Sequence, residues 1–291
     1  MNSNNTAARF AFWIFFLAFS VPAATLFAQP LAQSKASPLH IGILPISTTR
    51  VLVKNYLPLQ TYLERVLNRP VSLATASDFR TFHFNTLDGN YDLVITAAHL
   101  GRLAQTEAGY TPLARYTAPH RTLLIVAKDR PLKSVQDVRG KIVAGVDPVT
   151  LAMNEAMLWF KSQGLKADAD FTLLVTPTPI SAAYSLQSHQ SVMAISSPQG
   201  LKHLPESLKE SIEVFASLPE LPSLLWLAHP RMRPEISRLK AALLGFTAES
   251  SEGAMFYEAT GYMGMRDVTP RETQSMDALA REVRTLLDKK D

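Results

Sequence analysis

Short apolar runs alternate along the chain with segments in which apolar residues recur every three or four positions. The first run, residues 39–44, is too short for a helix and predicts a buried strand. A helical stripe follows, made of Leu59, Tyr62, Leu63, Val66 and Leu67. Pro58 would lie near the start of that helix, where proline is tolerated. The alternation continues to the C-terminus and predicts an α/β protein.

The remaining elements follow from the same pattern. The expected strands are residues 39–44, 71–74, 91–96, 111–116, 121–127, 142–146, 171–175, 192–195, 213–216 and 223–228. The further expected helices are residues 79–87, 97–107, 150–163 and 181–188, and the tail after Pro234 is expected to be helical, with its last helix at residues 276–287. Because the connections are short, we expect mainly parallel sheets with helices on both faces. Ligands of such sheets bind at the carboxyl ends of the strands, so the loops after the strands form the candidate site.

Residues 1–28 have the pattern of a secretory signal peptide. Arg9 supplies a positive start, residues 10–19 form an unbroken apolar run, and small residues follow Pro22. The apolar run is short for a membrane span, which needs about 20 residues, although an uncleaved anchor stays open as an alternative. Residues 29–37 would then be a flexible leader. This pattern predicts export to the periplasm.

Composition narrows the range of functions. The 291 residues include no cysteine, which excludes disulfides, thiolate metal sites and a cysteine nucleophile. The formal net charge is +4 without any long basic run, so we expect no nucleic-acid partner. The seven histidines are scattered, and no nucleophile elbow, phosphate-binding loop or dinucleotide motif is present. We therefore expect no metal, no cofactor and no enzyme activity, with a cleft enzyme as an alternative.

Two motifs have an order and spacing known from one family. Residues 87–93 read LDGNYDL, and residues 132–144 read LKSVQDVRGKIVA, with Asp147 and Pro148 shortly after them. Together they resemble the phosphate/phosphonate-type solute-binding proteins of ABC importers. The resemblance implies the type II periplasmic binding fold, in which two α/β lobes joined by two crossing segments hold a ligand in a cleft.

The resemblance also implies a division of the mature chain and a set of partners. Lobe 1 would comprise residues 38–120 and 222–291, and lobe 2 residues 121–221. The protein would capture a small-molecule ligand as a monomer and deliver it to the membrane permease of an ABC importer. A sensory subunit that signals to a membrane histidine kinase stays an alternative, because docking surfaces carry no motif that separates the two partners.

The sequence departs from this family where the ligand would bind. The hydroxyl-rich run expected after Asp-Pro is replaced by residues 149–153, VTLAM, in which only Thr150 keeps a hydroxyl. Residues 97–101, AAHLG, lack the family's serine and tyrosine, and residues 189–193 lack its acidic residue. The sequence therefore does not identify the solute. Helix N-terminal N–H groups are still expected at Ala98 and Thr150, where an anion such as a carboxylate could dock.

The candidate ligand-binding residues lie at strand ends and helix starts: Ser47, Thr48, Ala98, His99, Tyr116, Thr150, Ser181 and Ser196. The hydroxyls of Ser47, Thr48 and Thr150 could bind the solute or serve as ordinary helix caps. His99 could bind an anion or be a capping or surface histidine. Tyr116 could contact the solute or pack in the core. The last two serines could also serve ordinary turn chemistry.

Overall fold

The computed structural model describes residues 37–202 and 204–289. The expected signal peptide and the leader before residue 37 lie outside these ranges. The described residues belong to one compact unit of the chain. Within them, no helix combines the length and the apolar character that crossing a membrane requires.

The first sheet has six strands in the order β11-β4-β10-β3-β1-β2. They are β1 (Leu39–Ile43), β2 (Val71–Ala74), β3 (Leu93–Ala97), β4 (Thr111–Tyr116), β10 (Leu224–Ala228) and β11 (Met265–Arg266). All residues of β3 and β10 are buried, as expected for apolar strands covered on both faces. We call the part of the chain built on this sheet lobe 1.

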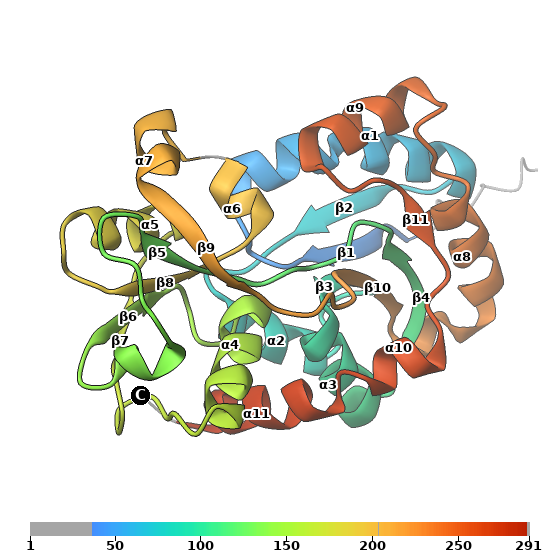
Figure 1. The fold of residues 1–291 in the computed structure, drawn as a ribbon. Coiled ribbons are helices and arrows are strands. Elements are labelled where there is room, and N and C mark those ends of the chain that lie inside the picture. The colour runs from blue at the N-terminus through green and yellow to red at the C-terminus, as the bar shows by residue number, and fades with distance from the viewer. Residues whose placement is uncertain (1–36, 203, 290–291) are drawn as a thin grey trace, which may run out of the picture. The chain divides into compact units, whose positions relative to one another are not determined.

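Helices cover both faces of the lobe 1 sheet (Figure 1). One face carries α1 (Thr49–Leu67), α8 (Ile236–Leu244) and α9 (Ser251–Thr260), and the other carries α2 (Phe79–Leu87), α3 (Ala98–Ala108), α10 (Pro270–Gln274) and α11 (Asp277–Asp288). The expectation that Pro58 lies near a helix start was wrong. The buried stripe of α1 starts before the predicted one, because Leu52 and Tyr56 are also part of it. Helix α1 therefore begins at Thr49, and Pro58 lies in its interior.

Lobe 2 is built on the second sheet, which has five strands in the order β7-β6-β8-β5-β9. They are β5 (Leu123–Ala127), β6 (Ile142–Gly145), β7 (Thr172–Val175), β8 (Met193–Ser196) and β9 (Ile212–Ser217). The helical elements are η1 (Val135–Val138), α4 (Leu151–Ser162), α5 (Pro179–Gln187), α6 (Pro198–Lys202) and α7 (Glu206–Ser211). Strand β5 alternates between two cores, because Leu123 and Ile125 pack with α5 and α7 whereas Leu124 and Val126 pack with α4.

Both sheets are mixed. Strands β1, β2 and β3 are parallel, and so are β6, β7 and β8. By contrast, β10 is antiparallel to β3 and β4, and β5 is antiparallel to β8 and β9. These antiparallel strands are the first that the chain forms after each passage between the lobes. The α/β architecture with helices on both faces is the predicted one, but the sheets are mixed where mainly parallel sheets were expected, because β10 and β5 pair antiparallel with both of their neighbours.

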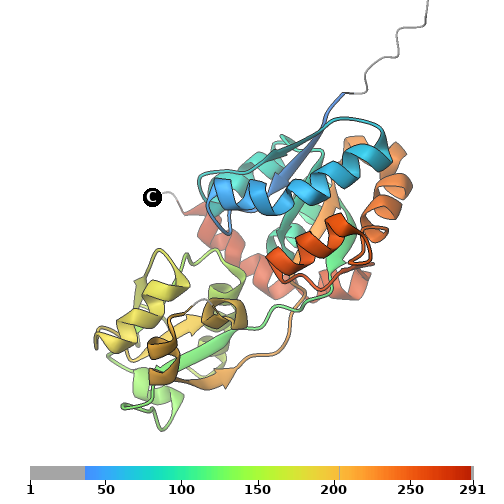
Figure 2. The same cartoon turned by 90° about the horizontal axis from the view of Figure 1, so that it is seen from above.

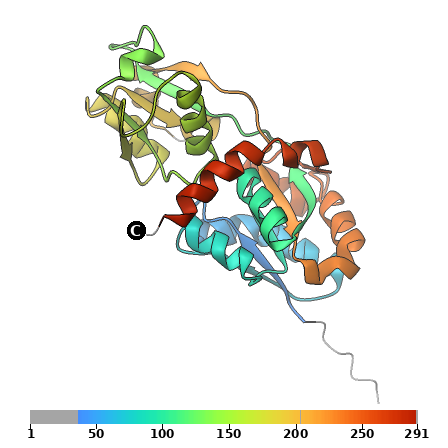
Figure 3. The same ribbon diagram turned by 90° about the horizontal axis from the view of Figure 1, so that it is seen from below.

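Two segments connect the lobes, and they run side by side in Figures 2 and 3. They form an antiparallel bridge in which the N–H of His120 donates to the carbonyl of Leu221 at 2.9 Å, and the N–H of Leu221 donates back at 3.0 Å. This arrangement is that of the two-lobed type II periplasmic binding fold. The residue bounds of the lobes given above stay a prediction.

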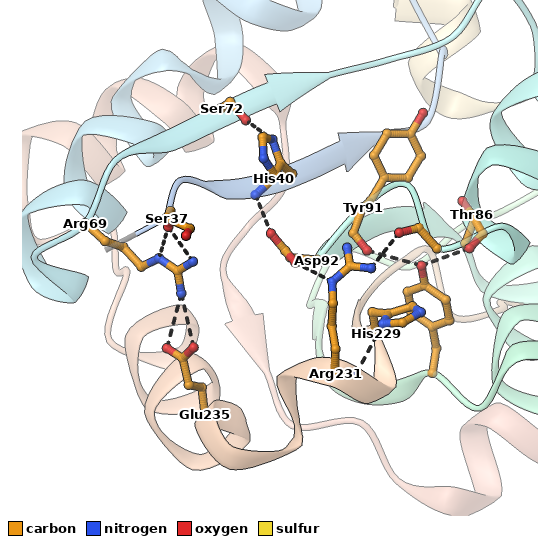
Figure 4. Close-up of polar contacts among 12 residues, drawn as sticks. Ser37, His40, Arg69, Ser72, Thr86, Tyr91, Asp92, His229, Arg231 and Glu235 are labelled. Carbon is orange, nitrogen blue, oxygen red and sulfur yellow. Dashed lines mark hydrogen bonds and ion pairs between the residues drawn. The ribbon is translucent and has the colours of Figure 1, made fainter. Parts of the chain in front are cut away.

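A polar network closes the amino ends of the lobe 1 strands (Figure 4). Asp92, just before β3, accepts the N–H of His40 in β1 at 2.8 Å and the Nε–H of Arg231 at 2.6 Å. Arg231, which lies in η2 (Pro230–Glu235), also donates from Nη1 to the carbonyl of Gly89 at 2.6 Å. These charged groups pair with one another at the amino ends of the strands. We therefore expect a ligand at the opposite, carboxyl ends.

Candidate functional site

Three long helices begin at the carboxyl ends of strands without a side-chain cap. Helix α1 follows β1 with N-cap Thr48, α3 follows β3 with N-cap Ala97, and α4 follows β6 with N-cap Thr150. The hydroxyl of Thr150 donates instead to the carbonyl of Asp147 at 2.8 Å. Helices α2 and α5 differ, because Asp78 and Thr178 accept N–H groups of their first turns. Uncapped first-turn N–H groups and the helix dipole favour an anion at the first three helices.

His99 joins the starts of α3 and α4. Its Nε2 lies 2.9 Å from the carbonyl oxygen of Val149, which precedes the N-cap of α4. The side chain is 0% exposed, and this burial lowers the pKa of His99 to about 4. The ring is therefore neutral at pH 7, and Nε2 carries the hydrogen because a carbonyl oxygen can only accept. Nδ1 is then a bare acceptor, buried and without a partner among the described residues.

Helix α4 has two buried faces. One face, with Met153, Ala156 and Phe160, belongs to the core of lobe 2. The other face is formed by residues at positions i, i+3, i+4 and i+7, namely Leu151, Asn154, Glu155 and Leu158. Leu151 belongs to the core of lobe 1 and Leu158 packs against that core. In Figures 1 and 3, α4 lies beside α11.

The two polar residues on this face are buried, and Glu155 contacts the segment that enters lobe 2. Asn154 is 2% exposed, and neither atom of its amide group has a partner among the described residues. Oε2 of Glu155 accepts from the hydroxyl of Thr122 at 2.6 Å, and Nε2 of His120 lies 3.1 Å from the same hydroxyl. Burial raises the pKa of Glu155 to about 7, although the Thr122 hydrogen bond opposes this, and burial lowers the pKa of His120 to about 4.

A cavity of about 330 Å³ opens beside the start of α1, at the ends of β1 and β2. Its lining is mostly apolar and is formed by Ile43, Leu52, Val53, Leu73, Ala74 and Ala76, with hydroxyls from Thr49, Thr75 and Ser77. The hydroxyl of Thr75 is already engaged, because it donates to the carbonyl of Ile43 at 2.7 Å. The cavity can therefore take a small apolar group next to an uncapped helix N-terminus.

The predicted residues of lobe 1 have different surroundings. Ser47 and Thr48 are exposed in the loop before α1. The N–H of Ala98 donates to the carbonyl of Ser223 at 3.1 Å, so the N–H groups of α3 without an acceptor among the described residues are those of His99 and Leu100. A ligand at α3 would therefore meet these two groups and not Ala98.

Tyr116 lies apart from this set. Its side chain is 0% exposed, and its ring stacks on Tyr262 with the ring centroids 4.2 Å apart. Its hydroxyl lies 3.5 Å from that of Tyr56. The surroundings of Tyr116 are those of a core residue, and its role as a ligand-binding residue stays a prediction.

The predicted residues of lobe 2 also separate into two groups. Thr150 lies at the start of α4, next to the contact between His99 and Val149. Ser196, at the end of β8, is 4% exposed and its hydroxyl has no partner among the described residues. Ser181 is engaged in the capping box of α5, where it exchanges hydrogen bonds with Thr178. The structure thus brings His99 and Thr150 together.

The residues expected from the sequence did not include Asn154, Glu155, Thr122 and His120. The signal that could have found the first two is their position in residues 151–160, LAMNEAMLWF, where they are the only strongly polar residues. Among the described residues, no group of three or more His, Cys, Asp or Glu side chains has an arrangement suited to a metal ion. Glu155, Thr122 and His120 form a hydrogen-bonded polar cluster between α4 and the connecting segment, and Asn154 precedes Glu155 on the same buried face of α4.

Three solved structures illustrate which known proteins share this fold. XAC2383 from Xanthomonas citri, in a structure bound to chloride ion, matches with a TM-score of 0.75, 19% identity and coverage of 86% of this chain and 100% of that one. PhnD1 from Prochlorococcus marinus, in complex with methylphosphonate, matches with a TM-score of 0.73, 12% identity and coverage of 85% and 98%. The periplasmic aliphatic sulphonate-binding protein SsuA from Escherichia coli matches with a TM-score of 0.62, 18% identity and coverage of 87% and 94%.

At these identities the structures establish the fold alone. No curated protein sequence matches the chain. The model of one protein family, the periplasmic substrate-binding proteins of phosphonate ABC transporters, matches residues 41–273. This range includes both sheets apart from the first residues of β1, and it includes α3, α4 and the polar cluster. The chain belongs to the family of periplasmic phosphonate-type substrate-binding proteins of ABC transporters.

Proposed function

We propose that this protein captures a small organic anion between α3 and α4 and delivers it to the permease of an ABC importer. The observation that carries the proposal is the meeting of two uncapped helix N-termini, one from each lobe, at the contact between His99 and Val149. Five first-turn N–H groups lack an acceptor among the described residues there, those of His99, Leu100, Leu151, Ala152 and Met153. N–H groups in this arrangement stabilise an oxyanion without any arginine or lysine.

The apolar cavity beside α1 supports an organic solute over a bare inorganic ion. It lies at the ends of β1 and β2, and β1 pairs with β3, the strand that α3 follows. The cavity and the start of α3 are therefore both at the carboxyl ends of the lobe 1 strands, where an organic solute has an apolar surface available. PhnD1 holds methylphosphonate and SsuA is named for aliphatic sulphonates, and both ligands combine an oxyanion with a short carbon group.

We also propose that the protein serves an ABC importer, acts as a monomer and has no enzyme activity. Members of the family are substrate-binding transport proteins, and a clamp that closes on a solute needs no second copy. A single species of one-chain mass in light scattering would support the monomer, and a stable dimer would contradict it.

Titration calorimetry of the exported chain tests the proposed function. The panel contains methylphosphonate, propylphosphonate, propanesulfonate, butyrate, inorganic phosphate and chloride. We expect one organic anion to bind with 1:1 stoichiometry, more tightly than phosphate or chloride. Absence of binding by every organic member of this panel and of its amino-substituted counterparts would contradict the proposal.

A matched pair of variants locates the site. Ala152→Pro removes one N–H group from the first turn of α4, where proline is tolerated. Loss of one hydrogen bond to a charged ligand weakens binding by about 10- to 150-fold. Ala278→Pro makes the same change at the equivalent position of α11 and should leave the affinity unchanged. Equal effects of the two variants would contradict the assignment to α4.

A further inference from the structure

Glu155 is buried close to the N–H groups that would hold the anionic solute. It occupies the fifth position of α4, whereas the uncapped N–H groups belong to the first three residues, Leu151, Ala152 and Met153. Four residues of an α-helix advance by about 6 Å, and helical side chains lean towards the N-terminus. An anion bound to these N–H groups would therefore lie within about 10 Å of the Glu155 carboxyl group.

An ionised Glu155 would repel an anion at this place. At a separation of about 8 Å and an effective dielectric constant of about 20, Coulomb's law gives a repulsion that lowers the affinity by about 30-fold. The positive helix starts attract the same anion. The charge of Glu155 therefore decides how much of this attraction remains, and a protonated carboxyl group leaves it intact.

The surroundings of Glu155 favour the protonated form. Its Oε2 accepts from the hydroxyl of Thr122 at 2.6 Å, and no lysine or arginine pairs with it among the described residues. A buried carboxylate without a counter-ion is costly, so burial raises the pKa of Glu155 to about 7. The carboxyl group is therefore about half protonated at pH 7.

Two histidines are the other titratable groups of this region. Nε2 of His120 lies 3.1 Å from the Thr122 hydroxyl that Glu155 accepts, and His99 lies at the start of α3. Burial lowers the pKa of both histidines to about 4, so both rings are neutral above pH 6. Neither histidine supplies a cation, and neither changes its charge in the range where Glu155 does.

The charged groups of the elements around α4 have partners or lie in another groove. On α11, Glu282 pairs with Lys161 of α4 at 3.0 Å. The remaining charges between α3 and α11 line a separate groove, and they are Arg102, Glu107, Asp277, Arg281 and Arg284. In the loop before α4, Oδ1 of Asp147 accepts the N–H of Val149 at 2.8 Å. On the lobe 2 sheet, the residues of β8 that pack with α4 are apolar, Met193 and Ile195.

We propose that the protein captures its anionic solute together with a proton: the anion lies at the starts of α3 and α4, Glu155 is protonated in the complex, and the affinity falls as the pH rises above neutral. This inference rests on the proposed function, because it describes how the same site is regulated. Below pH 7 the carboxyl group of the free protein already holds the proton, so the affinity is constant. Above pH 7 binding has to take the proton up, so the affinity falls until the complex also ionises.

Titration calorimetry between pH 6.5 and 9.5 measures this effect with propanesulfonate, butyrate, methylphosphonate and propylphosphonate. The sulfonate and the carboxylate keep one negative charge throughout this range. The phosphonates change their own charge within it, so the readout is the ratio of the wild-type to the Glu155→Gln dissociation constant at each pH. For the compounds that bind, we expect this ratio to rise by about 10- to 100-fold from pH 6.5 to 9.5. Glu210→Gln, an exposed change in α7, is the matched control and should follow the wild type.

Thr122→Val is a second variant, which carries the test if Glu155→Gln does not unfold cooperatively. It removes the hydrogen bond that favours the ionised form of Glu155, at almost unchanged volume. The fall in affinity should then move to higher pH than in the wild type. A profile that does not move would overturn the assignment of the proton to Glu155.

Proton uptake gives an independent readout. Calorimetry in buffers of different ionisation enthalpy counts the protons that accompany binding, and at pH 7 the wild type should take up about half a proton more than Glu155→Gln. A ratio of dissociation constants that stays constant with pH, or a wild type that releases protons relative to the variant, overturns the inference while the proposed function stands. Absence of binding by all four anions and by their amino-substituted counterparts overturns the proposed function itself.

Discussion

Glu155 should make the stability of the protein fall as the pH rises from weakly acidic to neutral. The residue is 8% exposed, and its carboxyl group accepts a hydrogen bond from Thr122 and has no counter-ion among the described residues. Burial therefore raises its pKa to about 7, whereas 4.5 is the ordinary value. Glu155→Gln keeps the size of the side chain and a hydrogen-bonding oxygen but cannot ionise, so it isolates the effect of the charge.

The sign and the size follow from proton linkage. Between pH 4.5 and 7 the folded protein holds a proton at Glu155 that the unfolded chain has released, so the free energy of unfolding decreases as the pH rises. Below this window both states are protonated, and above it both are ionised, so the contribution is constant. The difference between a pKa of about 7 and 4.5 corresponds to at most about 3 kcal/mol.

Urea unfolding of the wild-type protein and of Glu155→Gln at half-unit intervals from pH 4.5 to 8.5 measures this contribution. The two proteins share every other titrating group, so the contributions of those groups to the pH dependence cancel in the difference between the two curves. We expect the variant to gain up to about 3 kcal/mol on the wild type across the window, with most of the change below pH 7. A difference in the free energy of unfolding that does not vary with pH would refute the conclusion that the Glu155 carboxyl group is buried without a counter-ion.

Three further changes test the packing around the site. Gly42→Ala should destabilise by about 1–3 kcal/mol, because a Cβ would lie 2.6 Å from the ring of Tyr91; an unchanged melting temperature would contradict this contact. Asp92→Asn should cost about 1.5–3 kcal/mol in urea unfolding by weakening the charged bond to Arg231, whereas a neutral effect would show that the network of Figure 4 is not stabilising. Lys161→Ala should change stability by less than about 1 kcal/mol, because its ion pair is largely exposed, and a larger loss would show that this pair holds α4 to α11.

The local pattern of apolar and polar residues was sufficient to predict most of the helices and strands. The helix at residues 79–87 and the strand at residues 111–116 have the bounds that the sequence predicts. Helix α9 lies in the tail after Pro234 that was expected to be helical, but its bounds could not be predicted, because its sequence SEGAMFYEAT includes Gly253 and has no clear apolar stripe. The antiparallel direction of β10 could not be predicted either, since it depends on the path by which the chain returns from lobe 2.

The only part of the candidate site that could be predicted from the sequence is the part formed by the starts of helices. The contact of His99 with the residue before Thr150 joins two loops that strand ends and helix starts had singled out. The burial of Asn154 and Glu155 depends on α4 packing against two cores at once, which no local pattern shows. For the same reason the sequence left open whether Tyr116 packs in the core, and the aromatic cluster around it includes Tyr262, far along the chain.

The central claim is that an anionic solute binds to the uncapped starts of α3 and α4. A crystal structure of the protein with the solute that binds most tightly in the titrations tests it most directly. The account predicts oxygen atoms of the solute at about 2.7–3.1 Å from N–H groups of both helices, among them those of His99 and Ala152. A solute bound elsewhere, with those N–H groups facing only water or protein, would contradict it.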